Sequence, residues 1–503
     1  MIDFNLNFSV PWMLPVTLGW LALPFFGGFC IYLLPRFDRG LALGITIASV
    51  IYGLLQILSP EPFTIVLLDN FGVTLEIDSL SGYFILTNAL VTAAILFYCW
   101  STDKSTFFYT QLILLQGSIN AVFISGDFIS VYVALEVISI AAFLLMTYSR
   151  SDRSIWIGLR YLFVSNTVML FYLIGVALVY RNTQSFAFTG IQNAPPEATV
   201  LMLLGLLTKG GIFASALWLP LTHSEAETPV SALLSGVVVK AGVLPLIRLA
   251  LLSPDLDSLV RFLGVASALM GVSFAIFSKD TKRMLAFHTV SQLGFVVAAP
   301  AVGGFYALTH GLVKSALFLL AGNLPHRTFK SLKRDGIRTT LWIPLTIASL
   351  SIAGLPILSG FAAKSLTLKY LLPWQVWAMN LAAVGTAISF AKFIFLPHSA
   401  SPHLAPDQNS QTYQHSQKTP SFWAAITLLL GGLVLTNGFY LEAYSPSSMF
   451  KAVGTIAGGW LIYWTLIKPL AFQFPNLNPF EKFEHLIGGM TLMLTFLFWM
   501  VFL

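Results

Sequence analysis

The sequence predicts an all-α polytopic membrane protein, and three observations support this fold class. First, 56% of the residues are hydrophobic and 10% are charged, with a mean hydropathy of +0.80, whereas soluble domains carry about 25% charged residues. Second, the 503 residues provide about 14–16 transmembrane helices of about 20 residues each. Third, lysines flanked by glycine or proline interrupt several apolar runs, which predicts helices broken at bilayer depth.

Apolar runs of membrane-spanning length follow one another along the chain, near residues 13–34, 41–59, 79–99, 107–126, 128–148, 155–180, 200–220, 228–252, 258–278, 284–303, 304–323, 341–371, 374–396, 422–441, 450–470 and 484–503. Residues 61–78 alternate between apolar and polar in places and contain the turn-like pair Asp69-Asn70, which predicts a surface hairpin. Residues 397–421 are rich in Pro, Ser and Gln, which is typical of a polar linker.

The placement of lysine and arginine predicts the orientation. These residues collect in alternate loops, at Arg36, Arg39, Lys104, Arg150, Arg153, Lys279, Lys282, Arg283 and in the run 326–338. By the positive-inside rule these loops face the cytoplasm and the N-terminus lies outside. The first residues lack a basic segment, so the first apolar run is expected to act as the insertion signal.

Two ionisable residues stand out in the first half of the chain. Glu136 is alone in a long apolar run, and Lys209 lies beside Gly210 and Gly211 in another. An intramembrane charge is costly and usually marks an ion path, so we expect the two to form a switchable proton site. The alternatives are a structural ion pair and, for the lysine, a side chain that snorkels to the interface.

Further titratable residues continue this pattern. Lys240 lies mid-run near Gly236 and Gly242, and Lys364 follows Pro356 and Gly360 five runs after the first lysine. An odd number of spans between two similar segments predicts an inverted repeat. We expect both lysines to act as proton relays, the alternative being structural pairing.

One predicted helix carries two such residues. His310 and Lys314 are four residues apart and therefore share a helical face. A neutral histidine passes protons near physiological pH, so this pair could connect two sites. The alternative is a hydrogen-bonded histidine that packs between helices.

Four residues form a second tier of candidates. Lys392 is near a helix end, where snorkelling is an equal alternative. His288 closely follows a basic loop and is either a relay or a helix-start hydrogen bonder. Asp127 falls at a span boundary, as a proton entrance or a solvated turn, and Arg160 is a candidate second partner of the Glu136/Lys209 pair.

The sequence favours transport over catalysis. It contains no phosphate-binding, dinucleotide-binding or zinc-protease motif, so we expect no cofactor, no metal and no nucleic-acid partner. Cys30 and Cys99 are too few for a disulfide framework or for an iron–sulfur cluster bound by this chain alone. We therefore expect a transporter subunit that is not an enzyme by itself.

The ordered motifs carry a family resemblance. Glu136 is followed by "LLTKGGIFASALWLPLTHSEAETPVSALLSGVVVKAGV", "SKDTKRMLAFHTVSQLGF", "LTHGLVKSALFLLAGN" and "AGLPILSGFAAKS". Over about residues 60–400 the chain resembles the antiporter-like subunits of respiratory complex I and of Mrp-type sodium/proton antiporters, and most of all the D subunit of the Mrp antiporters. The resemblance implies two inverted five-helix repeats, with the seventh, eighth and twelfth helices broken.

The resemblance also implies domains and residue roles. The expected units are N-terminal helices with the hairpin (1–106), a first repeat (107–252), a second repeat (253–396), the linker (397–421) and C-terminal helices (422–503). Glu136 and Lys209 correspond to the family's glutamate–lysine pair, Lys240 to its connecting lysine, His310 and Lys314 to the inter-repeat pair and Lys364 to its terminal lysine. The sequence departs from the family at Ala214, Ala216 and Tyr306.

These inferences together predict a proton-translocating subunit of a multisubunit sodium(cation)/proton antiporter in the bacterial inner membrane or an equivalent energy-coupling membrane. Its expected partners are other membrane subunits, the lipid bilayer, protons and sodium. The alternatives are a proton-pumping subunit of a complex I-type NAD(P)H/ferredoxin:quinone oxidoreductase, an energy-coupling subunit for inorganic-carbon uptake, and a structural membrane anchor with static ion pairs.

Overall fold

The fold is all-α and polytopic, as the composition predicts. The computed structural model describes residues 13–58, 61–68, 72–400, 419–469 and 482–502. In this part of the chain, 14 helices are long and apolar enough to cross a membrane, which lies within the expected range. Most of the expected linker, and the pair Asp69-Asn70, fall outside the described residues.

The N-terminal part combines three helices with a small hairpin. The helices are α1 (Met13–Leu33), α2 (Asp38–Leu58) and α3 (Ser79–Cys99). Between the last two, β1 (Phe63–Val66) pairs antiparallel with β2 (Thr74–Ile77). Asp78 then caps α3, because its carboxylate accepts a hydrogen bond from the Ser81 N–H at 2.7 Å.

The next group of helices contains two interruptions at membrane depth. Its members are α4 (Thr106–Ile124), α5 (Phe128–Met146), α6 (Asp152–Thr183), α7 (Pro196–Gly210), α8 (Leu219–Glu225), α9 (Thr228–Leu233) and α10 (Lys240–Leu252). Helix α7 ends because Gly211 adopts a left-handed conformation with φ +62°. A π-helical turn at Leu234–Val238 separates α9 from α10, so the expected seventh and eighth spans are both broken.

The following group repeats the pattern with a break in its fourth span. Its members are α11 (Pro254–Phe277), α12 (Thr281–Ala298), α13 (Gly303–Ala321), α14 (Phe329–Asp335), α15 (Thr339–Ala353), α16 (Ser359–Lys369) and α17 (Pro373–Ile394). Gly354, with φ +94°, ends α15. The break between α15 and α16 therefore lies in the expected twelfth span.

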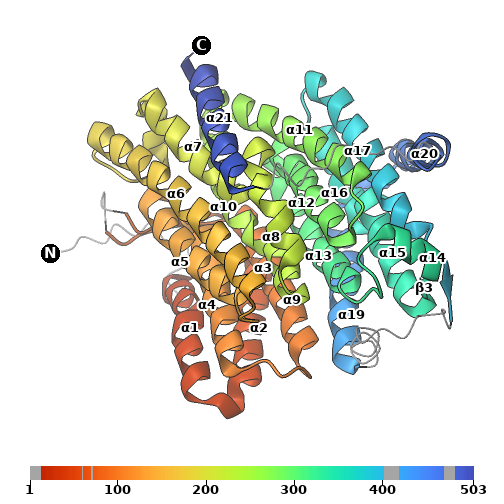
Figure 1. Cartoon of the computed structure of the whole chain (residues 1–503). Coiled ribbons are helices and arrows are strands. Elements are labelled where there is room, and N and C mark those ends of the chain that lie inside the picture. Colours follow the sequence, from red (N-terminus) through yellow and green to blue (C-terminus); the bar gives the residue numbers. More distant parts are fainter. Residues whose placement is uncertain (1–12, 59–60, 69–71, 401–418, 470–481, 503) are drawn as a thin grey trace.

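The C-terminal helices cover both groups. They are α19 (Pro420–Leu435), α20 (Pro446–Ile462) and α21 (Phe483–Phe502). Helix α19 packs on α3 and α13, α20 packs on α17, and α21 packs on α7 (Figure 1). The first and last helices of this segment, α19 and α21, thus contact different parts of the helical body.

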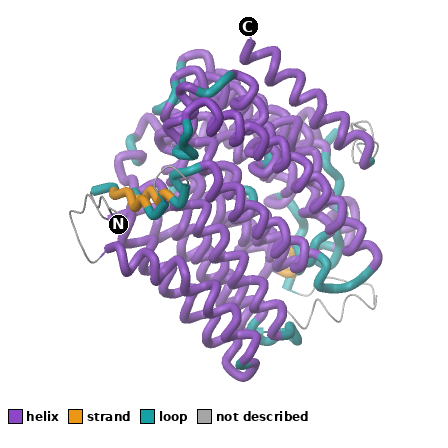
Figure 2. Tube along the Cα trace, turned by 90° about the vertical axis from the view of Figure 1, so that its left-hand side faces the viewer, coloured by secondary structure: helices purple, strands orange, loops and turns teal. Residues whose placement is uncertain are grey.

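Two small sheets lie on opposite sides of the helices (Figure 2). One is the hairpin of β1 and β2, and the other is the parallel pair of β3 (Ile337–Arg338) with β4 (His398–Ser399). The second sheet belongs to the basic loops.

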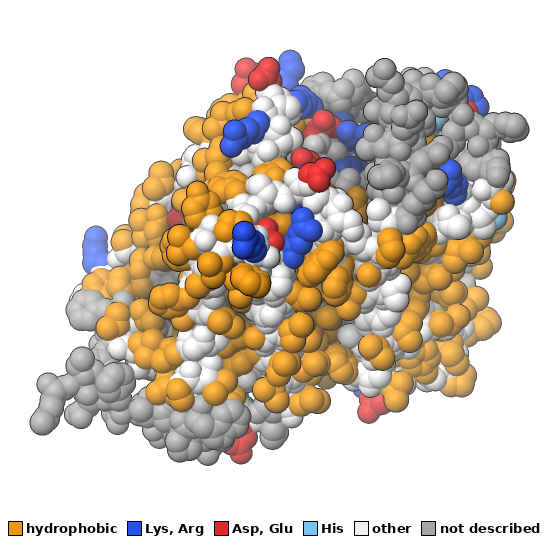
Figure 3. Space-filling view, turned by 90° about the horizontal axis from the view of Figure 1, so that it is seen from below, with side chains coloured by type: hydrophobic (Ala, Val, Ile, Leu, Met, Phe, Trp, Pro, Cys, Tyr) orange, Lys and Arg blue, Asp and Glu red, His pale blue; other side chains and the backbone are white. Residues whose placement is uncertain are grey.

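Ion pairs bring the basic loops together on one face. Charged side chains occupy a limited area of the view from below, between broad hydrophobic areas (Figure 3). Five connections are joined by the contacts Lys104–Glu227 (2.5 Å), Arg327–Asp280 (3.0 Å), Arg327–Glu225 (3.3 Å) and Arg153–Glu225 (3.5 Å). These loops include those from which the orientation is predicted.

Candidate functional site

Four of the lysines that the sequence singles out are buried inside the helical body. The exposed fraction is 7% for Lys209, 0% for Lys240, 0% for Lys314 and 7% for Lys364. Within the described part of the chain, none of the four forms an ion pair with a carboxylate. Their partners are backbone carbonyls, hydroxyls and a histidine, which hold an ammonium group less firmly than a carboxylate does.

Lys209 occupies the last turn of α7, directly before its break. Its Nζ donates to Ser165 Oγ at 2.5 Å, to Ser139 Oγ and to Leu135 O at 3.3 Å. The two hydroxyls, from α5 and α6, are 3.0 Å apart. A cavity of about 10 Å³ adjoins the lysine, which is close to the smallest space that admits one water molecule.

Glu136 lies one residue from the Leu135 carbonyl that Lys209 contacts, but the two side chains form no direct ion pair among the described contacts. Its Oε1 is buried and has no hydrogen-bond partner in the structure. The rest of the residue is half-buried, between the exposed side chains of Val133 and Val137. The carboxylate is therefore near Lys209 and also near the outer surface of α5.

The direction of the Lys240 side chain depends on the π-helical turn that precedes it. Its Nζ donates to Gly236 O at 2.5 Å and lies 3.2 Å from His310 Nδ1. Single π-helical turns are uncommon and concentrate at functional sites. The turn thus directs the lysine of α10 toward the histidine of α13, and the structure brings these two predicted residues together.

His310 and Lys314 share one face of α13, one turn apart. The Nζ of Lys314 donates to Leu285 O of α12 and lies 5.1 Å from the ring centroid of Phe318. The Nε2 of His310 is buried without a hydrogen-bond partner. The polar contacts therefore pass from α10 through α13 to α12.

Helix α12 also lies close to Lys364, which follows the break between α15 and α16. His288, one turn after Leu285, is fully buried, and neither ring nitrogen has a hydrogen-bond partner. It lies within electrostatic range of Lys314 and Lys364. Further along, Lys364 Nζ is 5.6 Å from the ring centroid of Phe295.

Lys364 sits on α16, after the break. Its Nζ donates to Ala353 O, the last carbonyl of α15, at 3.2 Å. The lysine also lines an open cavity of about 490 Å³ between α16, α17 and α20. This cavity is far larger than the one of about 10 Å³ beside Lys209.

Two second-tier residues have local partners that are typical of structural roles. Lys392 donates to Ala275 O at 3.2 Å and Ser278 O at 2.9 Å, and so caps the C-terminus of α11. Asp127 is fully buried, caps the N-terminus of α5 and also accepts from the Thr74 N–H at 2.8 Å. It is not a solvated turn.

Arg160 lines a different cavity, on the outer side of α6. Its guanidinium lies 5.5 Å from the ring of Trp156. The cavity, of about 550 Å³, is completed by Phe483 at the start of α21.

Some residues that contact the candidate lysines are absent from the sequence-based set. Ser139 and Ser165 bind Lys209, and the spacing of Ser139 three residues after Glu136, which places both on one helical face, is a signal that could have identified it. His223 of α8 is fully buried and lies in electrostatic range of Lys314. The sequence signal that could have identified His223 is its position shortly after the apolar run 200–220.

The polar contacts described above do not form one continuous path. Among the described residues, no hydrogen bond joins the Lys209 group to Lys240. Their helices nevertheless pack closely, because a Cβ on Gly242 would lie 2.7 Å from the carbonyl carbon of Lys209. Tyr306, where the family has a histidine, donates to Gln292 Oε1 at 2.7 Å and so joins α13 to α12.

Comparison with known proteins shows which group shares this architecture. Residues 125–389 match the family described as NADH:quinone oxidoreductase/Mrp antiporter, TM. The N subunit of the NADH-quinone oxidoreductase from Desulforudis audaxviator is 30% identical over 361 residues, which cover 65% of this chain and 72% of that protein. The D subunit of the Na(+)/H(+) antiporter from Alkalihalophilus pseudofirmus is 28% identical over 325 residues, or 58% and 66% of the two chains.

The fold also resembles that of a solved assembly. A chain of the Mrp complex from a Dietzia species superposes with a TM-score of 0.70 at 22% identity, covering 91% of this chain and 57% of that one. The similar proteins are subunits of multisubunit membrane assemblies. The chain therefore belongs to the NADH:quinone oxidoreductase/Mrp antiporter transmembrane family.

Proposed function

We propose that this chain translocates protons as a subunit of an Mrp-type sodium(cation)/proton antiporter. Lys209 exchanges protons with the cytoplasmic side, Lys240, His310 and Lys314 carry them laterally, and Lys364 releases them on the other side. The observation that carries the proposal is the burial of all four lysines with no carboxylate partner among the residues that the structure describes. A charged ammonium is costly in such surroundings, so each lysine can alternate between its charged and neutral forms.

The same observation argues against a purely structural anchor. A static ion pair requires a carboxylate close to each lysine, whereas Lys240 and Lys364 bond to backbone carbonyls. Carbonyl dipoles favour the charged form without binding it as strongly as an opposite charge would.

Glu136 is the proposed link to a neighbouring subunit. It is half-buried at the outer surface of α5, one residue from the carbonyl that Lys209 contacts. Movement of a charge next to this carboxylate would therefore change the proton affinity of Lys209. A carboxylate facing lipid is costly, which favours coverage of this surface by another protein chain.

We further propose that the chain resides in an energy-coupling cytoplasmic membrane with its N-terminus outside. The clustering of the basic loops on one face supports this orientation through the positive-inside rule. The cavity beside Lys364 then opens on the outer side, because it adjoins the first turns of α17 whereas the last turn of α17 reaches Ser278 in a basic loop.

The test is proton transport by everted membrane vesicles that contain the assembled complex. Glu136→Ala and Lys209→Ala are each expected to abolish antiport while the complex still assembles, as judged by co-purification of its subunits. Full antiport in either variant would contradict the proposed roles.

A second candidate function is a proton-pumping subunit of a complex I-type oxidoreductase, which the 30% identity to the N subunit of such an enzyme favours. The composition of the purified complex separates the two functions. Flavin or iron–sulfur partners that co-purify with the chain would establish the oxidoreductase, and their absence together with sodium-dependent antiport would establish the antiporter.

A further inference from the structure

The cavity beside Lys364 has features that proton release does not require. It encloses about 490 Å³ between α16, α17, the turn before α20 and the first turns of α20. This volume falls in the range of sites that hold small molecules, whereas a chain of water molecules needs far less space. We call this cavity the vestibule.

The vestibule carries an excess of positive charge. Its charged lining residues are three lysines, Lys364, Lys369 and Lys451, and one carboxylate, Glu442. Within the described chain no ion pair joins Glu442 to any of these lysines. Lys364 uses one described hydrogen bond, to Ala353 O, although an ammonium group has three donors.

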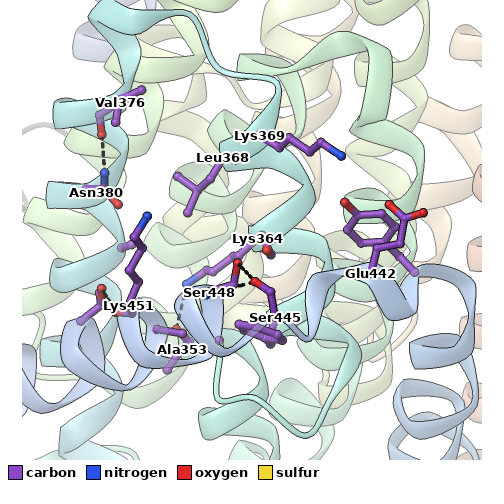
Figure 4. A pocket seen from close by; sticks show the side chains of 17 residues that line it. Ala353, Lys364, Leu368, Lys369, Val376, Asn380, Glu442, Ser445, Ser448 and Lys451 are labelled. Carbon is purple, nitrogen blue, oxygen red and sulfur yellow. Dashed lines mark hydrogen bonds between the residues drawn. The ribbon is translucent and has the colours of Figure 1, made fainter.

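Neutral donors add to the positive lining. Ser445, Ser448 and Asn380 all line the vestibule. Ser445 Oγ donates to Ser448 Oγ and Asn380 Nδ2 donates to Val376 O, both at 2.9 Å, which leaves the Ser448 hydroxyl and the second amide proton of Asn380 for a ligand. Figure 4 shows Ser445 and Ser448 beside the Lys364 side chain, with Lys451 and Asn380 on one flank and Lys369 and Glu442 on the other. Lysine ammonium groups combined with hydroxyl and amide donors are suited to a compact oxyanion, above all a phosphate group.

Exposed aromatic residues adjoin two lining residues in the sequence. Trp377 follows Val376 of the lining and is 87% exposed, and Phe450 precedes Lys451 and is 81% exposed. Tryptophan is enriched where membrane helices meet the lipid head groups. An exposed tryptophan near the start of α17 is therefore expected at head-group level, and the first turns of α17 also line the vestibule.

We propose that the vestibule binds a phosphate group, supplied by an anionic lipid head group or by free phosphate, between Lys369 and Lys451. Lys364 forms the floor of the site and adds positive charge whenever it is protonated, and Glu442 opposes binding from the rim. The site does not depend on the proposed transport function, since it rests on the charge and volume of the vestibule alone.

The test is binding of defined ligands to the full-length chain, purified within its assembly in a non-ionic detergent and followed by native mass spectrometry. The probes are dioleoylphosphatidylglycerol, which is anionic, dioleoylphosphatidylcholine, which carries the same phosphodiester without net charge, and inorganic phosphate. A lysine near a phosphate surface contributes roughly a fivefold change in binding. The variants are Lys369→Gln with Lys451→Gln, Glu442→Gln and, as a control on the exposed surface of α14, Lys330→Gln.

We expect phosphatidylglycerol to bind more tightly than phosphatidylcholine. Binding should fall about 25-fold in the double lysine variant, rise about fivefold in Glu442→Gln and stay unchanged in Lys330→Gln. Competition by inorganic phosphate at similar concentrations would identify free phosphate as the source, and its failure to compete would identify the lipid. Equal binding of the two lipids and of phosphate by the wild type and the double variant would overturn the proposal, as would weaker binding in Glu442→Gln.

Because the readout is binding, it is independent of transport. Loss of antiport in a variant that still binds phosphatidylglycerol bears only on the proposed function. Normal antiport in a chain with no anion preference refutes only the vestibule site.

Discussion

Replacement of Lys240 by methionine separates a relay residue from a structural one. The side chain is fully buried and donates to Gly236 O at 2.5 Å, with His310 Nδ1 at 3.2 Å. Methionine has a similar length but no proton to transfer. Proton-transfer groups typically contribute 10²–10⁴-fold to a rate, so transport should fall by at least about 100-fold.

The stability of the same variant should change little. The lost hydrogen bonds to the ammonium group contribute about 1.5–3 kcal/mol each. The substitution also removes a buried charge without a carboxylate partner, and the desolvation of that charge costs several kcal/mol. The two effects have opposite signs and similar size, so the thermal unfolding midpoint of Lys240→Met should stay within a few degrees of the wild type.

The assay is proton uptake by everted vesicles, with complex assembly measured in the same preparation. Lys392→Met is the matched control, because Lys392 is also a buried lysine with two carbonyl partners, but at the end of α11. We expect this control to retain transport and, because the same two opposing effects apply to it, to show a similarly small change in the unfolding midpoint. Transport above about a tenth of the wild-type rate in assembled Lys240→Met would refute the relay role.

Three further predictions concern the break after Lys209, the two serines that bind Lys209 and the ion pair at the end of α14. Gly211→Ala should destabilise the chain by about 1–3 kcal/mol, measured by thermal unfolding, since its φ of +62° is strained for any residue with a Cβ; an unchanged midpoint would contradict this. The double variant Ser139→Ala with Ser165→Ala should slow antiport severalfold in assembled complexes, because it removes both hydroxyls that position the lysine before the break; an unchanged rate would show that the hydroxyls are dispensable. At the C-terminal end of α14, the hydrogen bond from Arg334 lowers the pKa of Asp335 below its ordinary 3.8. This contact therefore stabilises the end of α14 above pH 3.8 and is lost as the pH falls through the lowered pKa. Hydrogen exchange at the end of α14 should rise in that range, and Asp335→Asn should abolish the pH dependence.

The sequence was sufficient to predict the fold class and the broken helices. Apolar runs report span number because only a closed set of backbone hydrogen bonds is stable in lipid. The break at Gly211 was visible because glycine adopts left-handed conformations at no steric cost. In the twelfth span the sequence pointed to Pro356 and Gly360, whereas the left-handed residue that ends the helix is Gly354. Most of the run at 284–303 is helical as expected, although α12 is not among the 14 helices that are long and apolar enough to cross a membrane, since Lys282, Arg283 and further polar residues lower its hydropathy.

The partners of the charges were harder to predict than the charges themselves. An isolated glutamate and an isolated lysine suggest an ion pair, but Lys209 instead bonds to two serines and a carbonyl. Serines are common in apolar helices, so their spacing alone does not distinguish a ligand of the lysine from a packing residue. The π-helical turn before Lys240 was not predictable either, because its glycine predicts only a weak point in the helix.

The helix breaks help to explain how two of the lysines, Lys240 and Lys364, are held inside the helical body. A helix end leaves carbonyl groups without their usual N–H partners, and carbonyls at two of the breaks accept bonds from Lys240 and Lys364. Ala353, the last residue before the break at Gly354, provides its carbonyl to Lys364, and Gly236 in the π-helical turn provides its carbonyl to Lys240. The breaks thus supply a partial negative charge at bilayer depth, which lowers the cost of an ammonium group without a fixed counter-ion. A carboxylate in the same place would hold the proton on the lysine, whereas a carbonyl lets it leave, and this is the property that a relay requires.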